Sequence, residues 1–207
     1  NGGDHLRRFP ESVKQVAVAD RLIVTKTDLA APGQLSALHA SLRRLNKSAP
    51  VFEVSDGDIQ PPALLTDDMY DTAGRRREIE HWLGAPPGNE ALVHDHADNI
   101  HSFALTYDTA LDWTAFGIWM TMLLHRHGDN VLRIKGLLNV AGVPTPVLIN
   151  GVQHIVHPPS HLPAWPSENR QSRIIFIVRD MEQEGIETSL AAFNNLANPS
   201  AMPGRPA

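Results

Sequence analysis

Residues 19–29 read ADRLIVTKTDL, an apolar run that ends in a polar turn. The run 21–24 is short and rich in branched aliphatic side chains, which is typical of a buried strand in a parallel sheet. The turn at residues 25–28 would then lie beyond the carboxyl end of that strand. Ligands of parallel sheets bind at this edge, so the turn is the first candidate for a functional site.

The sequence on either side of this run predicts two helices and a second strand: a helix at 11–19 that begins with Pro10, a helix at 33–46, and a strand at 50–54. In the second helix, leucines recur at three- and four-residue spacing and form one apolar face. Helix, strand, helix and strand in this order predict a parallel α/β sheet. Two strands alone do not make a stable sheet of this kind, so we expect the fold to begin before residue 1 and the chain start to lie within a loop.

A different composition follows. Residues 61–98 are rich in proline and carry an acidic surplus, and they are predicted to be a linker with short helices at 62–70 and 75–83. From residue 99 to 197 a second domain is predicted, and residues 198–207 have the composition of a disordered tail. The predicted elements of this second domain are a strand at 102–107, a helix at 113–127, strands at 131–140, 146–149, 153–156 and 173–178, and a helix at 181–196. This order predicts an α+β domain with its helices on one face of a mostly antiparallel sheet.

The helix predicted at 113–127 has the clearest internal pattern. Asp112 is its predicted N-cap, and Gly128 its predicted end. Its buried stripe is predicted to contain Trp113, Phe116, Met120, Leu123 and Leu124.

Composition excludes several classes of function. The 207 residues contain no cysteine, so no disulfide, thiolate zinc site or cysteine nucleophile lies within them. The formal net charge of −5 argues against general binding of nucleic acid, which needs a basic surface. No apolar stretch has the length needed to cross a membrane, and no G-x-S-x-G elbow of a serine hydrolase is present.

The polar turn can recognise guanine. In the tetrapeptide from Thr25 to Asp28, the aspartate carboxylate can accept two hydrogen bonds from the N1–H and amino group of guanine, a donor pair that adenine lacks. The stem of Lys26 can lie along the base while its charge stays in water. Ser55 begins the Ser-Asp-Gly segment after the second strand, which resembles the place where P-loop GTPases have a loop whose backbone N–H contacts the guanine O6. The alternative for both segments is an ordinary solvated turn.

Two stretches resemble a known family. Residues 9–29, FPESVKQVAVADRLIVTKTDL, resemble the segment around the base-specificity motif of CobW-type GTPases. Residues 130–178 resemble the CobW C-terminal domain, through the motifs 132–138, 146–151, Trp165 with Pro166, and 173–178. The resemblance covers most of the chain with its motifs in the correct order. It implies a partial P-loop GTPase domain at 1–60 and a CobW C-terminal α+β domain at 99–197.

The family resemblance further implies a cytoplasmic metallochaperone that couples GTP and magnesium to the handling of zinc or cobalt. A metal-receiving client protein would be its partner. Thr25, Lys26, Asp28 and Ser55 would bind the nucleotide. The family's P-loop and its Cys-x-Cys-Cys metal motif have no counterpart in these residues. We therefore expect both to precede Asn1, and we expect this chain alone not to hydrolyse GTP, with no catalytic residue of its own.

Histidines and two basic residues leave alternatives open. His94 and His96, with His101 nearby, can act as metal ligands or simply belong to a solvated linker. Arg133 and Lys135 lie two apart on a predicted strand and so share one face of it. That face is either solvated or a contact for the GTPase half or a client.

Three functions are therefore compared. The first is a GTP-dependent metallochaperone, the second a non-enzymatic α+β module that binds a partner or a metal, and the third a histidine-based metal buffer. The sequence leaves the metal, the client and the oligomeric state open.

Overall fold

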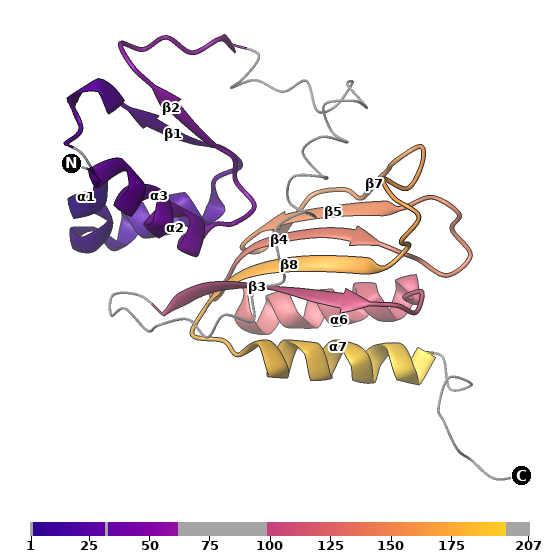
Figure 1. Ribbon diagram of the computed structural model, residues 1–207. Helices are drawn as coiled ribbons and strands as arrows, with labels where there is room; N and C mark the ends of the chain where they lie inside the picture. Colours follow the sequence, from indigo (N-terminus) through magenta and orange to yellow (C-terminus); the bar gives the residue numbers. More distant parts are fainter. Residues whose placement is uncertain (1, 32, 62–98, 198–207) are drawn as a thin grey trace, which may run out of the picture. The chain divides into compact units, whose positions relative to one another are not determined.

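The computed structural model describes residues 2–31, 33–61 and 99–197, and the chain divides into two compact units at residues 102 and 103 (Figure 1). Apart from Pro61, the predicted linker lies outside the described residues, together with its two short helices and the predicted tail. Each unit is considered by itself below.

The first unit contains a pair of parallel strands and three helices. Its elements are α1 (Gly2–Arg8), α2 (Pro10–Val18), β1 (Leu22–Thr25), the short 3-10 helix η1 (Thr27–Leu29), α3 (Gln34–Leu45) and β2 (Val51–Val54). Strands β1 and β2 are parallel, and their register runs from Leu22 opposite Val51 to Thr25 opposite Val54. The predicted strand pair and the predicted α3 are confirmed.

The loop expected at the start of the chain is wrong, because helix α1 occupies Gly2–Arg8. Its charges suit a helix: Asp4 lies in the first turn, Arg7 and Arg8 in the last, and Arg7 pairs with Asp4. The helix has no fully buried residue, and only Leu6 packs partly against the core of Leu22, Leu42 and Ala49. The sequence pattern did not predict α1, because this helix contains two glycines and has no apolar face.

Asn46, the residue after α3, links the end of α2 to the segment before β2 through side-chain hydrogen bonds. Its side chain is buried, and its amide nitrogen donates to the carbonyl oxygens of Val16, Ala17 and Ala19 at the end of α2. Its carbonyl oxygen accepts hydrogen bonds from Ser48 and from the backbone N–H of Ala49. One side chain thus satisfies backbone groups from the end of α2 and from the connection into β2.

The second unit is built on a six-stranded sheet. Its elements are β3 (Ile100–Tyr107), α6 (Trp113–His127), β4 (Val131–Leu138), β5 (Val147–Val152), β6 (Ile155–Val156), β7 (Ser160–His161), β8 (Ser172–Arg179) and α7 (Gln183–Ala197). The strand order is β3-β8-β4-β5-β6, with β7 also paired to β5. Strand β4 is antiparallel to both β5 and β8, and α6 and α7 cover the same face of the sheet (Figure 1). The predicted α+β arrangement is confirmed, with the additional two-residue strand β7.

Aromatic rings fill the space between the helices and the sheet. Phe176 on β8 is fully buried, stacks on Phe103 and meets the edge of Trp119. The indole N–H of Trp119 donates to Ser189 on α7 at 3.0 Å, which ties the two helices together. Asp112 caps α6 as predicted, because its side chain accepts from the N–H of Ala115.

The predicted buried stripe of α6 is wrong at one position. Phe116, Met120, Leu123 and Leu124 are buried, but Trp113 is 43% exposed and Trp119 takes its place in the core. Helical spacing alone does not separate the two tryptophans, because Trp113 has the i, i+3 and i+7 spacing to Phe116 and Met120 and stacks on Phe116. Trp113 is the first residue of α6 and therefore lies at the end of the buried stripe, whereas Trp119 lies in the middle of the helix.

The solvated alternative for Arg133 and Lys135 is also wrong, since both side chains are buried. They lie on β4, which has β5 and β8 as neighbours and is buried along its whole length. By register they share their face of the sheet with Ile175 and Ile177, not with the helix-facing Ile134 and Phe176. Burial also lowers the pKa of Arg173, which lies on the same face of β8.

Candidate functional site

The candidate site lies where the two parallel strands of the first unit end. Because Thr25 is opposite Val54 in the register, the segments after β1 and β2 leave the sheet at the same edge. The hydroxyl oxygens of Thr27 and Ser55 are 2.8 Å apart and form a hydrogen bond between these segments. Two stretches that are separated by 28 positions in the chain therefore form one surface.

The first segment is a tight turn with an unusual backbone at Lys26. This residue has φ 59° and ψ 39°, the left-handed conformation that side chains with a Cβ rarely adopt. The η1 turn follows immediately, with the N–H of Leu29 bonded to the carbonyl of Lys26. The result is that Lys26 and Asp28 are both solvent-exposed, with a cation and a carboxylate two residues apart. Strained backbone of this kind costs about 1–3 kcal/mol and is concentrated at functional sites.

The second segment is equally tight. Asp56 has φ 52° and Gly57 has φ 76°, and the N–H of Asp58 bonds to the carbonyl of Ser55. Gly57 suits this position because a left-handed backbone is free of steric cost only for glycine. Ser55 is exposed at the start of the turn, on the side that contacts Thr27.

The predicted site residues Thr25, Lys26, Asp28 and Ser55 therefore all lie at this edge and are all exposed. Together they offer a carboxylate acceptor, an ammonium group with an aliphatic stem and hydroxyl groups, which suit a flat polar ligand with adjacent donors. Sequence reasoning missed Thr27. Its hydroxyl after one strand and that of Ser55 after the next were the available signal, but their contact depends on the strand register.

The histidines give no such cluster. His94 and His96 lie outside the described residues. Within residues 2–31, 33–61 and 99–197, no group of three or more His, Cys, Asp or Glu side chains could hold a metal ion. His154, His157 and His161 are exposed, and His154 contacts Asp129 at 3.1 Å.

The two units together define a class of protein: a parallel α/β sheet with exposed polar turns at one edge, followed by an α+β domain. Residues 100–194 match the family described as "Cobalamin synthesis protein cobW C-terminal domain". The chain belongs to the CobW-type family.

Two curated relatives and two solved structures extend this comparison. The chain is 31% identical over 188 residues to the zinc chaperone YjiA of Escherichia coli (strain K12), covering 91% of this chain and 56% of that protein. It is 27% identical over 186 residues to the zinc chaperone CobW of Sinorhizobium sp, covering 86% and 49%.

The structure of zinc-bound YjiA GTPase from E. coli matches with a TM-score of 0.67 and 26% identity, covering 93% of this chain and 57% of that one. A zinc-bound triple mutant of the same GTPase matches equally well. The fold predicted from the sequence is thus confirmed: an α/β unit followed by a CobW C-terminal domain. The chain spans about half the length of these relatives. None of the helices in the described ranges is long and apolar enough to cross a membrane.

Proposed function

We propose that this chain supplies the guanine-recognition edge and the C-terminal domain of a GTP-dependent, zinc-handling metallochaperone. The metallochaperone relationship comes from the family and its zinc-chaperone members. The observation that carries the guanine assignment is the hydrogen bond between Thr27 and Ser55, which joins the turn of Lys26 and Asp28 to the turn of Ser55.

The residues divide the recognition between them. Asp28 accepts two hydrogen bonds from the N1–H and amino group of guanine, and the stem of Lys26 covers one face of the base. Thr25 and Ser55 complete the wall of the site. Phosphate and magnesium binding are not assigned to any described residue, so we do not expect these 207 residues to hydrolyse GTP by themselves.

Zinc is the proposed cargo and cobalt the alternative, for delivery to a client protein in the cytoplasm. The described residues do not fit a zinc site, because they contain neither a cysteine nor a cluster of three candidate ligands. The proposal therefore places no metal on the two folded units. The candidate ligands His94 and His96 remain a prediction.

The test uses amide NMR spectra of the isotope-labelled chain during titration with GTP, guanosine and ATP. Without phosphate contacts we expect weak binding, so the nucleotide is raised to millimolar concentration. GTP and guanosine should shift the amides of residues 25–29 and 55–57, and ATP should leave them unchanged.

Asp28→Ala should abolish these shifts, since it removes two charge-assisted hydrogen bonds that together contribute about 3 kcal/mol. Asp129→Ala is the control, because it removes the same charge from the second unit and should bind like the original chain. Equal shifts with ATP and GTP, or guanine-specific shifts that survive in Asp28→Ala, would refute the assignment. A chain with no shift at any concentration would favour the partner-binding module instead.

A further inference from the structure

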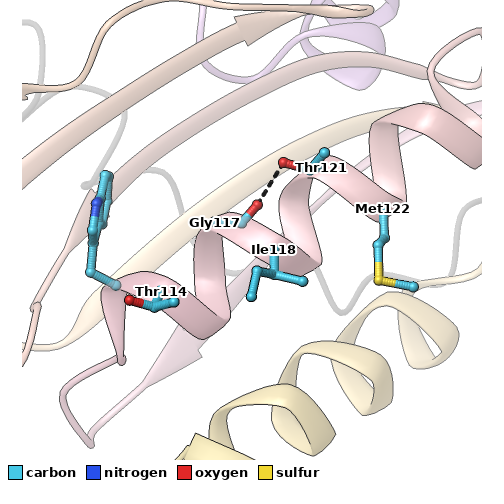
Figure 2. Close-up of a pocket in the computed structure, with 6 residues that line it drawn as sticks. Thr114, Gly117, Ile118, Thr121 and Met122 are labelled. Atoms are coloured by element: carbon cyan, nitrogen blue, oxygen red, sulfur yellow. Dashed lines mark hydrogen bonds between the residues drawn. The ribbon is translucent and has the colours of Figure 1, made fainter.

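The outer surface of α6 carries an apolar patch that the domain itself does not cover. Trp113, Ile118 and Met122 are 43%, 51% and 57% exposed. With Thr114, Gly117 and Thr121 they line a shallow depression of about 450 Å³ on this helix (Figure 2). By contrast, exposed positions of the neighbouring α7 include Glu184 and Glu187. An apolar patch of this kind is typical of an interaction surface.

Gly117 stands at the middle of this patch, and the domain itself does not require a glycine there. A Cβ built on Gly117 would meet nothing within 4 Å. Glycine inside a helix is unfavourable relative to alanine because it loses more backbone entropy on folding. A partner surface could come close to the backbone of α6 at this position only because glycine has no side chain.

Thr121 can be covered by a partner without loss of a hydrogen bond. Its hydroxyl donates to the carbonyl of Gly117 at 2.8 Å, as the dashed line in Figure 2 shows. The hydroxyl therefore needs no partner outside the helix, and covering Thr121 leaves no polar atom unsatisfied.

The six residues are arranged symmetrically about the midpoint between Gly117 and Ile118. Thr114 and Thr121 are equally far from this point, and so are Trp113 and Met122 at the two ends. Thr114, Gly117, Ile118 and Thr121 have the i, i+3, i+4, i+7 spacing of a single helix face. A two-fold axis through this point would pair the face with an antiparallel copy of itself and bring Thr114 of one copy opposite Thr121 of the other.

We propose that this chain self-associates through α6, in a two-fold symmetric, antiparallel helix pair centred between Gly117 and Ile118. Thr114 of each copy packs on Thr121 of the other. On one flank the two copies of Ile118 meet, with Met122 beside them. On the other flank the two copies of Gly117 meet, so the two helix backbones approach closely there, with one Trp113 on either side of this contact.

The charges at the ends of α6 favour the antiparallel direction. His125 and Arg126 are exposed in the last turn, whereas Asp108 and Asp112 precede the first turn. An antiparallel pair places the basic end of each helix beside the acidic end of the other, and it also aligns the helix dipoles favourably. A parallel pair would bring like charges together at both ends.

A single helix pair is small compared with the roughly 800 Å² per partner of a stable complex, so we expect a weak and reversible dimer. Sedimentation velocity over a concentration series, with the 207-residue chain in the presence of a chelator, should show a monomer that becomes a dimer. Ile118→Asp should weaken this association by about tenfold or more. Ile155→Asp is the matched control, because Ile155 is an isoleucine on β6 with 64% exposure, and its association should be unchanged. A chain that remains monomeric up to the highest concentration, or equal association of the two variants, would overturn the proposal.

Cysteine cross-linking tests the direction of the pair, since the chain has no cysteine of its own. The double variant Thr114→Cys/Thr121→Cys should form covalent dimers on oxidation. The two positions are seven residues apart on one helix, about 10 Å, which is too far for a disulfide within one copy. The single variant Thr114→Cys should not cross-link, because Thr114 faces Thr121 of the other copy. Cross-linking of the single variant, or none in the double variant, would contradict the antiparallel arrangement.

Discussion

Asn46 shows how much of the first unit depends on a single side chain. It is only 1% exposed and bonds to three carbonyl groups at the end of α2 and to Ser48 and Ala49 before β2. Asn46→Ala leaves these buried groups unsatisfied and should lower the free energy of unfolding of this unit by about 3 kcal/mol.

The measurement for Asn46 is amide hydrogen exchange in β1, because all tryptophans lie outside residues 1–61 and do not report on this unit. Exchange of the β1 amides should accelerate in Asn46→Ala. The exposed Asn195 on α7 offers the control Asn195→Ala, which should exchange like the original chain. Undiminished protection of β1 in Asn46→Ala would show that its hydrogen bonds are dispensable.

Tyr107 predicts a loss of stability at alkaline pH. Burial, and secondarily the negative charge of Glu187, raise the pKa of its phenol far above the usual value. The folded state therefore holds this proton more tightly than the unfolded state. Its contribution to stability is complete below the unfolded pKa of about 10 and is lost as the pH rises above it.

Tyr107→Phe removes this proton, so its melting temperature should fall less than that of the original chain between about pH 8 and pH 11. Glu187→Gln removes only the secondary charge and should reduce the fall by a smaller amount. Identical pH profiles for the original chain and Tyr107→Phe would show that the buried phenol is not responsible.

At the scale of elements, two glycines of the α6 segment predict effects of opposite sign. Gly117→Ala adds a Cβ that meets nothing within 4 Å, so it should stabilise the monomer by about 1 kcal/mol. Gly128→Ala places its Cβ 2.0 Å from Nδ1 of His154 and 2.6 Å from the carbonyl oxygen of Leu124, so it should destabilise the domain.

Thermal unfolding followed by tryptophan fluorescence, to which the buried Trp119 contributes, measures both changes. Gly117→Ala should at the same time weaken the self-association through α6, because its new methyl group would keep the two helix backbones from approaching each other closely at this position. A variant that is more stable and yet less associated separates the interface role of Gly117 from a structural one. A Gly117→Ala chain that is less stable as a monomer would contradict this account.

The same elements show what sequence alone could predict. Apolar spacing located β1, β2 and α3, and Asp112 marked the start of α6, because burial of one face and local capping leave direct traces in the sequence. Helix α1 was missed because it has no buried face to leave such a trace. Strand β7 was missed because its two residues are held by long-range pairing to β5.

Residues whose environment depends on tertiary neighbours were the hardest to predict. Arg133 and Lys135 were compatible with a solvated face by their charge, but both side chains are buried on the face of the sheet opposite to that of Ile134 and Phe176. The types and order of Thr25, Lys26, Asp28 and Ser55 identified the candidate site, since turns after parallel strands share an edge. The contact of Thr27 with Ser55 could not be predicted, because it depends on the register of β1 against β2.

At the scale of the whole molecule, the two units differ in how completely each can stabilise itself. In residues 99–197, two helices cover one face of a six-stranded sheet over a continuous aromatic and aliphatic core. In residues 2–61, the sheet has only two strands, and its core cluster contains Leu22, Leu42 and Ala49. Because isolated two-stranded sheets are marginal, we expect residues 99–197 to fold alone and residues 1–61 not to fold alone.

Separate expression of the two segments tests this expectation. Residues 99–197 should give dispersed amide NMR signals and a single cooperative thermal transition, with tryptophan fluorescence changing at the same temperature as circular dichroism. Residues 1–61 should give a collapsed NMR spectrum, and the Asn46 hydrogen bonds should be insufficient to hold α2 and α3 in place. If residues 1–61 fold alone, the hydrogen-bond network around Asn46 contributes more than its small core, and the boundary at residue 60 separates two independent domains. If residues 99–197 fail to fold, the buried face with Arg133 and Lys135 must be covered by another part of the chain before the sheet is stable.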